Sequence, residues 1–235
     1  MTLDKNFGRF KIFGFKLNLV FDIGAQVGLF SKNLSALYPE CKFILFEPNT
    51  NCNRELEEKK FEFYNWLLYE EPGKQVKFYI DKLDPISTGN SIYIEQTKYF
   101  DKNNFVILET KTLDQFSKSD LIDLIKLDVQ GAEINVLKGA INTLKKTKFV
   151  LVETSLKNYN LDSPLEGDVI KFMDSNGFKD YILFDKHIWN SDDLTHIELK
   201  KGECFQNDLL FINSKNNLFE RFKFKLLKYY IKIRS

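Results

Sequence analysis

The sequence predicts a doubly wound α/β fold built on a mostly parallel sheet. Two stretches, residues 20–31 and 122–133, each run from an apolar segment through an acidic residue and a glycine turn into a helical repeat of apolar residues. A third apolar run, Lys42–Phe46, follows the first stretch by one strand–helix unit. Buried parallel strands are continuous apolar runs, and the helices that cover them show apolar residues every three or four positions. Because the chain of 235 residues contains no linker, we expect one domain, residues 1–235.

Composition and charge narrow the functional classes. The formal net charge of +1 gives no general attraction to nucleic acid. Three cysteines without a Cys-x-x-Cys pair favour reduced thiols over disulfides or a structural zinc site. No apolar run approaches the roughly 18 residues that span a bilayer, and the first residues do not form a signal peptide. We therefore expect a cytoplasmic protein with no nucleic-acid partner.

Residues 1–17 are expected to form an N-terminal arm that covers the sheet. Aromatic residues alternate there with basic ones, as at Phe7, Arg9, Phe10 and Lys11. Such alternation is typical of a β-strand or a lid edge with one buried face. An arm that binds nucleic acid is the alternative.

The turn after the first strand is the first candidate binding site. A strand, a glycine turn and a helix in this order place backbone N–H groups and a helix N-terminus at the carboxyl edge of the sheet. Asp22 would repel a pyrophosphate but suits a ligand with an ammonium group or hydroxyls. The spacing Gly24-x-x-x-Gly28 also lacks the third glycine of the dinucleotide fingerprint. The candidate cofactor residues of this turn are Asp22, Gly24, Ala25, Gln26 and Gly28.

The apolar run Lys42–Phe46 ends in a second candidate site, Glu47-Pro48-Asn49. An acid at the end of this strand can accept hydrogen bonds from both ribose hydroxyls of a nucleotide. Glu47 and Asn49 therefore join the candidate cofactor residues. Several nucleotide cofactors carry this sugar, so the contact alone does not identify the ligand.

Residues 61–68 are predicted to form a third strand, followed by a Pro-Gly turn and a fourth strand over residues 76–80. Its position in the repeat would place Asn65 and Leu67 beside the adenine ring of the nucleotide. The polar connection 81–104 is expected to be a loop at the ligand edge, where loops often carry binding groups.

Residues 122–133 repeat the order of apolar strand, acid, glycine turn and helix. If this strand lies next to the first one, Asp128 and Asp22 face one crevice. The next apolar strand ends in Glu153. With Glu47, four strands then end in an acid, which suits either a divalent metal or a hydroxyl-rich ligand that carries an ammonium group.

The C-terminal third adds one candidate base. Residues 164–176 are predicted to form a helix, and residues 178–184 and 208–213 to form strands. His187 follows the first of these strands on the expected ligand edge, where a neutral imidazole can act as a general base near pH 7. A histidine with no catalytic role is the alternative.

Residues 218–235 are predicted to form a basic amphipathic helix, with six basic residues against one acid, Glu220. Its apolar residues recur at spacings of three or four, at Leu218, Phe222, Leu226, Tyr229, Tyr230 and Ile233. We expect the helix to pack on its own domain or on the partner subunit of a homo-oligomer. Peripheral contact with an anionic membrane is the alternative.

These motifs together resemble the FkbM family of class I S-adenosylmethionine-dependent methyltransferases. The similarity covers roughly residues 18–185 and rests on Val20 to Ser31, on Phe46-Glu47-Pro48-Asn49 and above all on Ile125-Lys126-Leu127-Asp128-Val129-Gln130-Gly131-Ala132-Glu133. Gln130 departs from the family pattern, in which Glu is usual. Gln26 and Val27 occupy a turn that often has Asn and an extra glycine.

The resemblance implies a seven-stranded Rossmann-like sheet, in which residues 208–213 fill an edge in antiparallel orientation. It implies S-adenosylmethionine as the cofactor and a hydroxyl oxygen on a sugar, glycan or related small molecule as the methyl acceptor. We expect no metal. An NAD-dependent oxidoreductase is the alternative enzyme, disfavoured by Asp22 and the missing glycine, and a non-catalytic scaffold module is the non-enzymatic alternative.

The resemblance also distributes roles among the candidate residues. Residues 24–28 would hold the methionine part of the cofactor, and Asp22 would act near its ammonium group. Glu47 would bind the ribose. Asp128 lies where the methyl group and the acceptor should meet, and with His187 and Glu153 it is the candidate for acceptor positioning or proton removal.

Overall fold

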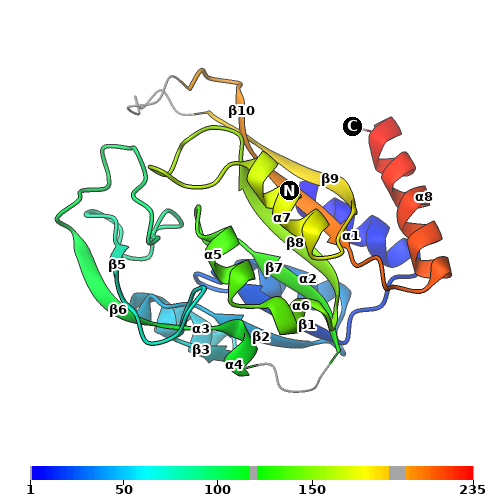
Figure 1. Ribbon diagram of the computed structural model, residues 1–235, viewed down its shortest axis with the longest axis horizontal. Helices are drawn as coiled ribbons and strands as arrows, with labels where there is room; N and C mark the ends of the chain where they lie inside the picture. The colour runs from blue at the N-terminus through cyan, green and yellow to red at the C-terminus, as the bar shows by residue number, and fades with distance from the viewer. Residues whose placement is uncertain (1, 117–120, 191–198, 235) are drawn as a thin grey trace.

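The structure is a computed structural model that describes residues 2–116, 121–190 and 199–234. Its largest element is a seven-stranded sheet (Figure 1). In spatial order the strands are β3 (Glu62–Tyr64), β2 (Lys42–Phe46), β1 (Leu19–Ile23), β7 (Ile122–Leu127), β8 (Thr147–Ser155), β10 (Cys204–Ile212) and β9 (Asp180–Ile188). Neighbours pair in parallel except at β10, which is antiparallel to both β8 and β9. The predicted seven-stranded, mostly parallel Rossmann-like sheet is confirmed.

One detail of the predicted sheet is wrong. Residues 208–213 were expected at an edge, but β10 lies between β8 and β9, so β9 is the edge strand. The last seven residues of β10 are all buried, as befits a strand with a neighbour on each side. This insertion brings side chains of β10 beside those of β8 and β9.

The strand order creates a switch point between β1 and β7. The chain proceeds from β1 outward to β2 and β3, and then returns to the other side of β1 to form β7 and β8. Asp22 pairs with Lys126 and Ile23 with Leu127 across this junction. Since connections leave β1 and β7 in opposite directions, a crevice opens at the carboxyl ends of these two strands.

Helices cover both faces of the sheet (Figure 1). One face packs against α1 (Thr2–Ile12), α2 (Leu29–Leu37), the 3₁₀ turn η1 (Thr50–Cys52), α3 (Asn53–Glu58) and α8 (Leu218–Arg234). The other face packs against α4 (Leu113–Phe116), α5 (Glu133–Lys138), α6 (Ile141–Leu144) and α7 (Glu166–Ser175). Each face has its own cluster of buried apolar side chains, which is the arrangement that defines a doubly wound fold.

A second, three-stranded sheet consists of β4 (Leu67–Leu68), β6 (Phe105–Lys111) and β5 (Gln75–Tyr79), in that spatial order. The single strand predicted over residues 61–68 therefore divides into β3 and β4. The chain changes sheets at Asn65, whose side-chain amide donates to the Glu47 carbonyl at 2.9 Å. This bond replaces a regular ladder contact at the point of the break.

The N-terminal arm is a helix, not the predicted strand or lid edge. Phe7 and Phe10 of α1 are spaced for one helical face, and both are buried. The Phe7 ring lies 4.9 Å from that of Phe184, and the Phe10 ring lies 5.0 Å from that of Phe149. The arm does cover the sheet, although its first residue, Met1, lies outside the described residues.

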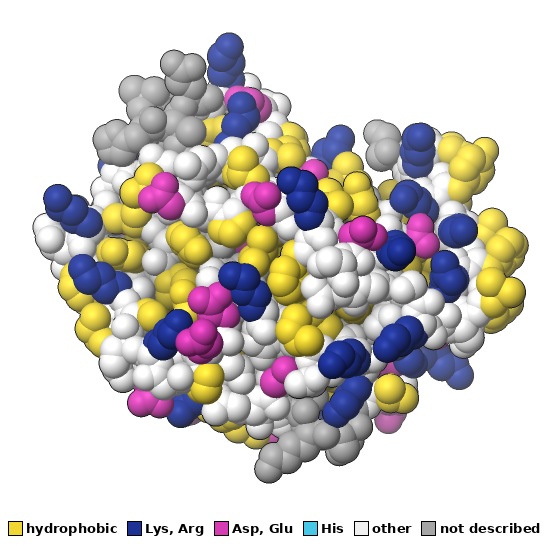
Figure 2. Space-filling model, viewed as in Figure 1, with side chains coloured by type: hydrophobic (Ala, Val, Ile, Leu, Met, Phe, Trp, Pro, Cys, Tyr) yellow, Lys and Arg dark blue, Asp and Glu magenta, His cyan; other side chains and the backbone are white. Residues whose placement is uncertain are grey.

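The C-terminal helix is present as α8, with Ser235 outside the described residues, but its orientation differs from the expectation. Phe224, Leu227 and Ile231 are the side chains buried against the sheet. The predicted apolar face of this helix instead points to solvent, where Figure 2 shows hydrophobic side chains along its outer edge. Among the described residues, no helix combines the length and the apolar character needed to cross a membrane.

Candidate active site

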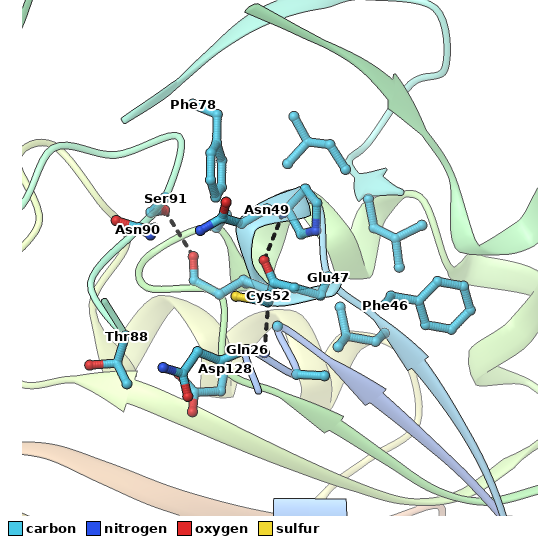
Figure 3. Close-up of a pocket in the computed structure, with 18 of the residues that line it drawn as sticks. Gln26, Phe46, Glu47, Asn49, Cys52, Phe78, Thr88, Asn90, Ser91 and Asp128 are labelled. Carbon is cyan, nitrogen blue, oxygen red and sulfur yellow. Dashed lines mark hydrogen bonds between the residues drawn. The ribbon is translucent and has the colours of Figure 1, made fainter. Parts of the chain in front are cut away.

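A cavity of about 250 Å³ lies at the carboxyl ends of β1, β2 and β7, at the switch point of the sheet. Figure 3 shows side chains from the two glycine turns, the end of β2 and the loop after β5 around it. The predicted cofactor residues that line it are Gly24, Ala25, Gln26, Glu47, Asn49, Leu67 and Asp128. Its walls also include Phe46, Trp66 and Leu68, so one end offers the apolar and aromatic surface that a purine ring requires.

Gly24 allows the first turn to approach β7. Its φ is +73°, and a Cβ atom there would lie 1.8 Å from the carbonyl oxygen of Asp128. No side chain can occupy that space. Gly28, at φ +74°, does not line the cavity, and a Cβ there would meet the flexible ends of Leu56 and Leu45 at 3.1 and 3.3 Å.

Glu47 holds the turn and the end of β2 together. Its two carboxylate oxygens accept hydrogen bonds from the backbone N–H groups of Gln26, at 2.8 Å, and Asn49, at 2.9 Å (Figure 3). Burial raises the pKa of Glu47 to about 7 despite these donors. Each oxygen can accept a further hydrogen bond, so the carboxylate can receive ribose hydroxyls as predicted.

Asp22 lies beneath the cavity and does not line it. Its carboxylate is fully buried, accepts a hydrogen bond from the Ser31 hydroxyl at 2.7 Å, and lies 3.6 Å from the Lys126 ammonium. Burial raises the pKa of Asp22. An action of this residue on a ligand ammonium group must therefore pass through water or neighbouring groups.

Lys126 is a site residue that the motif reasoning did not assign a role. Lys126 is among the residues that line the cavity, and its ammonium group lies 3.0 Å from Asp128 and 3.6 Å from Asp22. Burial lowers the pKa of Lys126, but these two carboxylates outweigh burial and raise it. The available signal was a lysine in a strand whose other residues are apolar except Asp123, because a buried cation requires a partner.

Asn65 turns away from the cavity. Its exposed side chain exchanges hydrogen bonds with Asn53 in addition to binding the Glu47 carbonyl. Trp66, rather than Asn65, lines the cavity beside Leu67. Asn49 contributes a loop contact, since its side-chain amide donates to the Pro85 carbonyl at 2.6 Å and so anchors the connection 81–104.

Asp128 and Glu153 are joined by Gln130. The Gln130 side-chain amide donates to Asp128 at 2.8 Å and to Glu153 at 2.7 Å. Burial would raise the pKa of Asp128, but the Lys126 charge and the hydrogen-bond donors around it lower it. Burial and the charge of Asp128 raise the pKa of Glu153 well above its usual value. Asp128 therefore loses its proton at lower pH than Glu153 does.

His187 lies beside Glu153, as predicted, and beside Asp208, which was not predicted as a site residue. Its Nε2 atom is 2.9 Å from Asp208 and 3.6 Å from Glu153. The hydrogen bond with Asp208 raises the pKa of His187. Asp208 could be found only from the pairing of β10 with β9. These three side chains lie next to the cavity rather than in its lining, and Gln130 connects them to Asp128.

The same trio has the spacing of a cation site. Among the residues that the structure describes, the ligand atoms of Glu153, His187 and Asp208 lie within 4.8 Å of one another. Two carboxylates and an imidazole suit several divalent metals. The direct contact between His187 and Asp208 equally suits a proton-transfer pair.

The chain is similar in sequence to one protein family and to one curated methyltransferase. Residues 22–179 match the methyltransferase FkbM domain. The 2-O-methyltransferase NoeI from Sinorhizobium fredii (strain NBRC 101917 / NGR234) is 26% identical over an alignment of 153 positions, which covers 58% of this chain and 63% of that relative. The match thus spans less than two thirds of the relative's length.

Two solved structures resemble the chain weakly. An S-adenosylmethionine-dependent methyltransferase from Clostridium acetobutylicum ATCC 824 is 9% identical, with a TM-score of 0.49 over 90% of this chain and 91% of that one. Magnesium protoporphyrin IX methyltransferase from Synechocystis PCC 6803, with bound SAH, is 12% identical, with a TM-score of 0.48 over 91% and 82%. Likeness at this level supports no inference about substrate or ligand.

Proposed function

The chain belongs to the FkbM methyltransferase family, and from that premise we propose that it transfers a methyl group from S-adenosylmethionine to a hydroxyl oxygen of a sugar, glycan or related small molecule. The observation that carries the proposal is the cavity at the switch point, which joins the Gly24 turn, Glu47 and Asp128. Oxygen as the methylated atom is supported by the similarity to a 2-O-methyltransferase. The sugar or glycan class follows from the family resemblance.

The residues of the cavity fit this cofactor. Gly24 lets the first turn lie directly against the Asp128 carbonyl, so that the turn and Asp128 line the same cavity. Glu47 offers acceptor oxygens for a ribose, and Trp66, Leu67 and Leu68 offer an apolar wall for adenine. Asp128 contributes a carboxylate to the cavity lining, the kind of group that a cofactor with an ammonium and a sulfonium charge requires.

When bound, S-adenosylmethionine supplies an electrophilic methyl group. The protein must align the acceptor oxygen with that group and accept the proton that the hydroxyl releases. Asp128 lines the cavity and is ionised, so it can orient the acceptor hydroxyl as a hydrogen-bond acceptor. His187 is the proposed base, because Asp208 holds one ring nitrogen and leaves the other to accept a proton.

Binding calorimetry tests the cofactor. We expect heat of binding with S-adenosylmethionine and with its demethylated product, and none with NADH. Glu47→Ala should weaken binding by about 1–3 kcal/mol, because the ribose hydroxyls lose their buried partner. Binding of NADH alone would replace the proposal with an oxidoreductase, and an unchanged affinity in Glu47→Ala would place the ribose elsewhere.

Transfer of labelled methyl groups tests the acceptor. Free sugars, nucleotide sugars and glycan fragments should be offered with labelled S-adenosylmethionine, and products examined by mass spectrometry for the oxygen modified. We expect activity to persist in EDTA. Activity that EDTA abolishes and Mg²⁺ or Mn²⁺ restores would instead assign Glu153, His187 and Asp208 to a metal site.

A further inference from the structure

The C-terminal helix α8 has three distinct faces. Phe224, Leu227 and Ile231 form the inner face and are almost fully buried. They attach the helix firmly to the core cluster that it shares with α1 and α2. The two remaining faces are therefore held in a fixed orientation toward solvent.

The second face is an exposed apolar stripe. It consists of Leu218, Phe219, Phe222, Leu226, Tyr229 and Ile233, which we call the outer stripe. At 3.6 residues per turn these six residues fall within an arc of about 100°. Phe219 is 70% exposed, Phe222 57% and Ile233 63%. Contiguous exposed apolar residues of this kind mark interaction sites on soluble domains.

The third face is basic. Lys225, Lys228 and Lys232 are exposed, and at 3.6 residues per turn they follow one border of the outer stripe. Figure 2 shows dark-blue side chains beside yellow ones on α8. Arg221 and Lys225 also line a hollow at the start of the helix together with Leu218, Phe219 and Phe222. Since the whole chain has a formal net charge of only +1, the rest of it is on balance acidic, and the positive charge is concentrated here.

From this arrangement we propose that α8 docks the protein on a membrane surface that contains anionic phospholipid. A helix that lies in the membrane interface inserts an apolar face between headgroups and directs Lys and Arg to the anionic phosphates beside it. The outer stripe supplies the first element, and the lysine row along its border supplies the second. The buried inner face supplies the attachment that keeps both directed outward.

The positive charge beside the outer stripe favours an anionic membrane over a second copy of the chain as the partner of α8. In a two-fold dimer with antiparallel α8 helices, each outer stripe would meet its own copy, and the two lysine rows would lie along the same border of the contact. Like charges in a partly buried contact oppose such a dimer. Anionic headgroups complement the same lysines, and the attraction grows with each basic residue near the surface.

Co-sedimentation with vesicles tests the proposal on the full chain. The probes are phosphatidylcholine vesicles with and without phosphatidylglycerol. We expect about tenfold or stronger binding when phosphatidylglycerol is present, and weaker binding as salt is raised. The double variant Phe222→Ser/Tyr229→Ser should lose about tenfold or more, whereas Leu121→Ser, an equally apolar and exposed site before β7, should bind as the wild type does.

A second double variant tests the contribution of the lysines separately from that of the outer stripe. Lys225→Gln/Lys232→Gln retains the outer stripe and should lose most of the preference for phosphatidylglycerol. Melting temperature and binding of the demethylated cofactor should be unchanged in both double variants, because the substituted side chains are exposed and remote from the cavity.

Three results would overturn the proposal. One is an absence of binding to either vesicle, and another is equal binding to both. The third is a dimer, detected by light scattering, that Phe222→Ser/Tyr229→Ser dissociates in a protein that ignores vesicles. Since none of these measurements uses methyl transfer, their failure would leave the proposed enzymatic function untouched.

Discussion

The two ends of the candidate site are built in different ways. The cofactor end, around Gly24 and Glu47, is formed by backbone: a turn without a side chain, and a carboxylate held by two backbone N–H groups. The acceptor end is formed by side chains from the turn after β7 and from β8, β9 and β10 that form hydrogen bonds with one another. The first end provides a rigid surface, and the second provides groups that exchange protons.

This difference separates binding from chemistry. Changes at the cofactor end should alter shape and affinity, because backbone positions there depend on close contact. Changes at the acceptor end should alter protonation, because Asp128, Glu153 and His187 share charges and hydrogen bonds. Lys126 contacts the carboxylates of Asp22 and Asp128, which lie toward different ends of the site. A substitution of Lys126 should therefore affect both cofactor binding and protonation.

The largest effect is expected at Lys126. Lys126→Met leaves the buried carboxylates of Asp22 and Asp128 without their shared cation and should cost about 3–5 kcal/mol of unfolding free energy. Denaturant unfolding measures this. Lys138→Met removes an exposed partner of Glu70 and should cost less than about 1 kcal/mol. Equal losses of unfolding free energy in Lys126→Met and Lys138→Met would show that the charge of Lys126 does not connect the two ends of the site.

The second effect separates two glycines with nearly equal φ angles. Gly24→Ala should destabilise the protein by about 3 kcal/mol and abolish cofactor binding, because the new Cβ meets the Asp128 carbonyl oxygen. Gly28→Ala should cost about 1 kcal/mol, since it adds backbone strain but meets flexible side chains. Equal stability of the two variants would contradict the close contact assigned to Gly24.

The third effect should be confined to the acceptor end. His187→Gln should lower kcat by about 100-fold, the usual scale for loss of a general base, and leave cofactor affinity unchanged. In Asp208→Asn the loss of a partner that favours imidazolium lowers the pKa of His187. Because the base must be neutral to accept a proton, the rise of kcat with pH should move to lower pH in this variant.

A pH–rate profile with parallel calorimetry measures both quantities. Loss of cofactor affinity in His187→Gln would show that the two ends are not separable. A profile that does not move in Asp208→Asn would remove His187 from the role of base.

The smallest effect is a pH dependence of binding at the cofactor end. Glu47 has a pKa raised to about 7 and must be ionised to accept both ribose hydroxyls. Affinity for the demethylated cofactor should therefore fall as pH is lowered through that value, by about tenfold at one pH unit below it. The pH dependence should be absent in Glu47→Gln, and calorimetry across the range compares the two proteins.

Most of the correct predictions came from patterns of residues that are adjacent in the sequence. The glycine turns, the strand-end acids and the alternation of strands and helices are patterns of neighbours along the chain, so they could be recognised without tertiary information. Residues 24–26 and Glu47 line the cavity, and the family assignment covers the same stretches. The catalytic and cofactor roles assigned to the individual residues remain predictions.

Local sequence patterns gave a wrong prediction where the same pattern is compatible with two kinds of secondary structure. The alternation of aromatic and basic residues in 1–17 suits a strand edge, but Phe7 and Phe10 share a face only in a helix, where they pack against Phe184 and Phe149. Gln26 and Gln130, which depart from the family pattern, both adopt positive φ, at 48° and 52°. The turns keep their shape because surrounding contacts hold a conformation that these residues rarely adopt alone.

The tertiary structure alone decided which groups meet. Asp208 reaches His187 only because β10 inserts between β8 and β9, and the same insertion brings Gln206 to Glu153. The outward direction of the stripe on α8 likewise depends on which of its two apolar faces the sheet covers. The sequence by itself determined where strands, turns and acids occur. Folding determined which acid has a raised pKa and which a lowered one, because that depends on charges and burial supplied by residues distant in the chain.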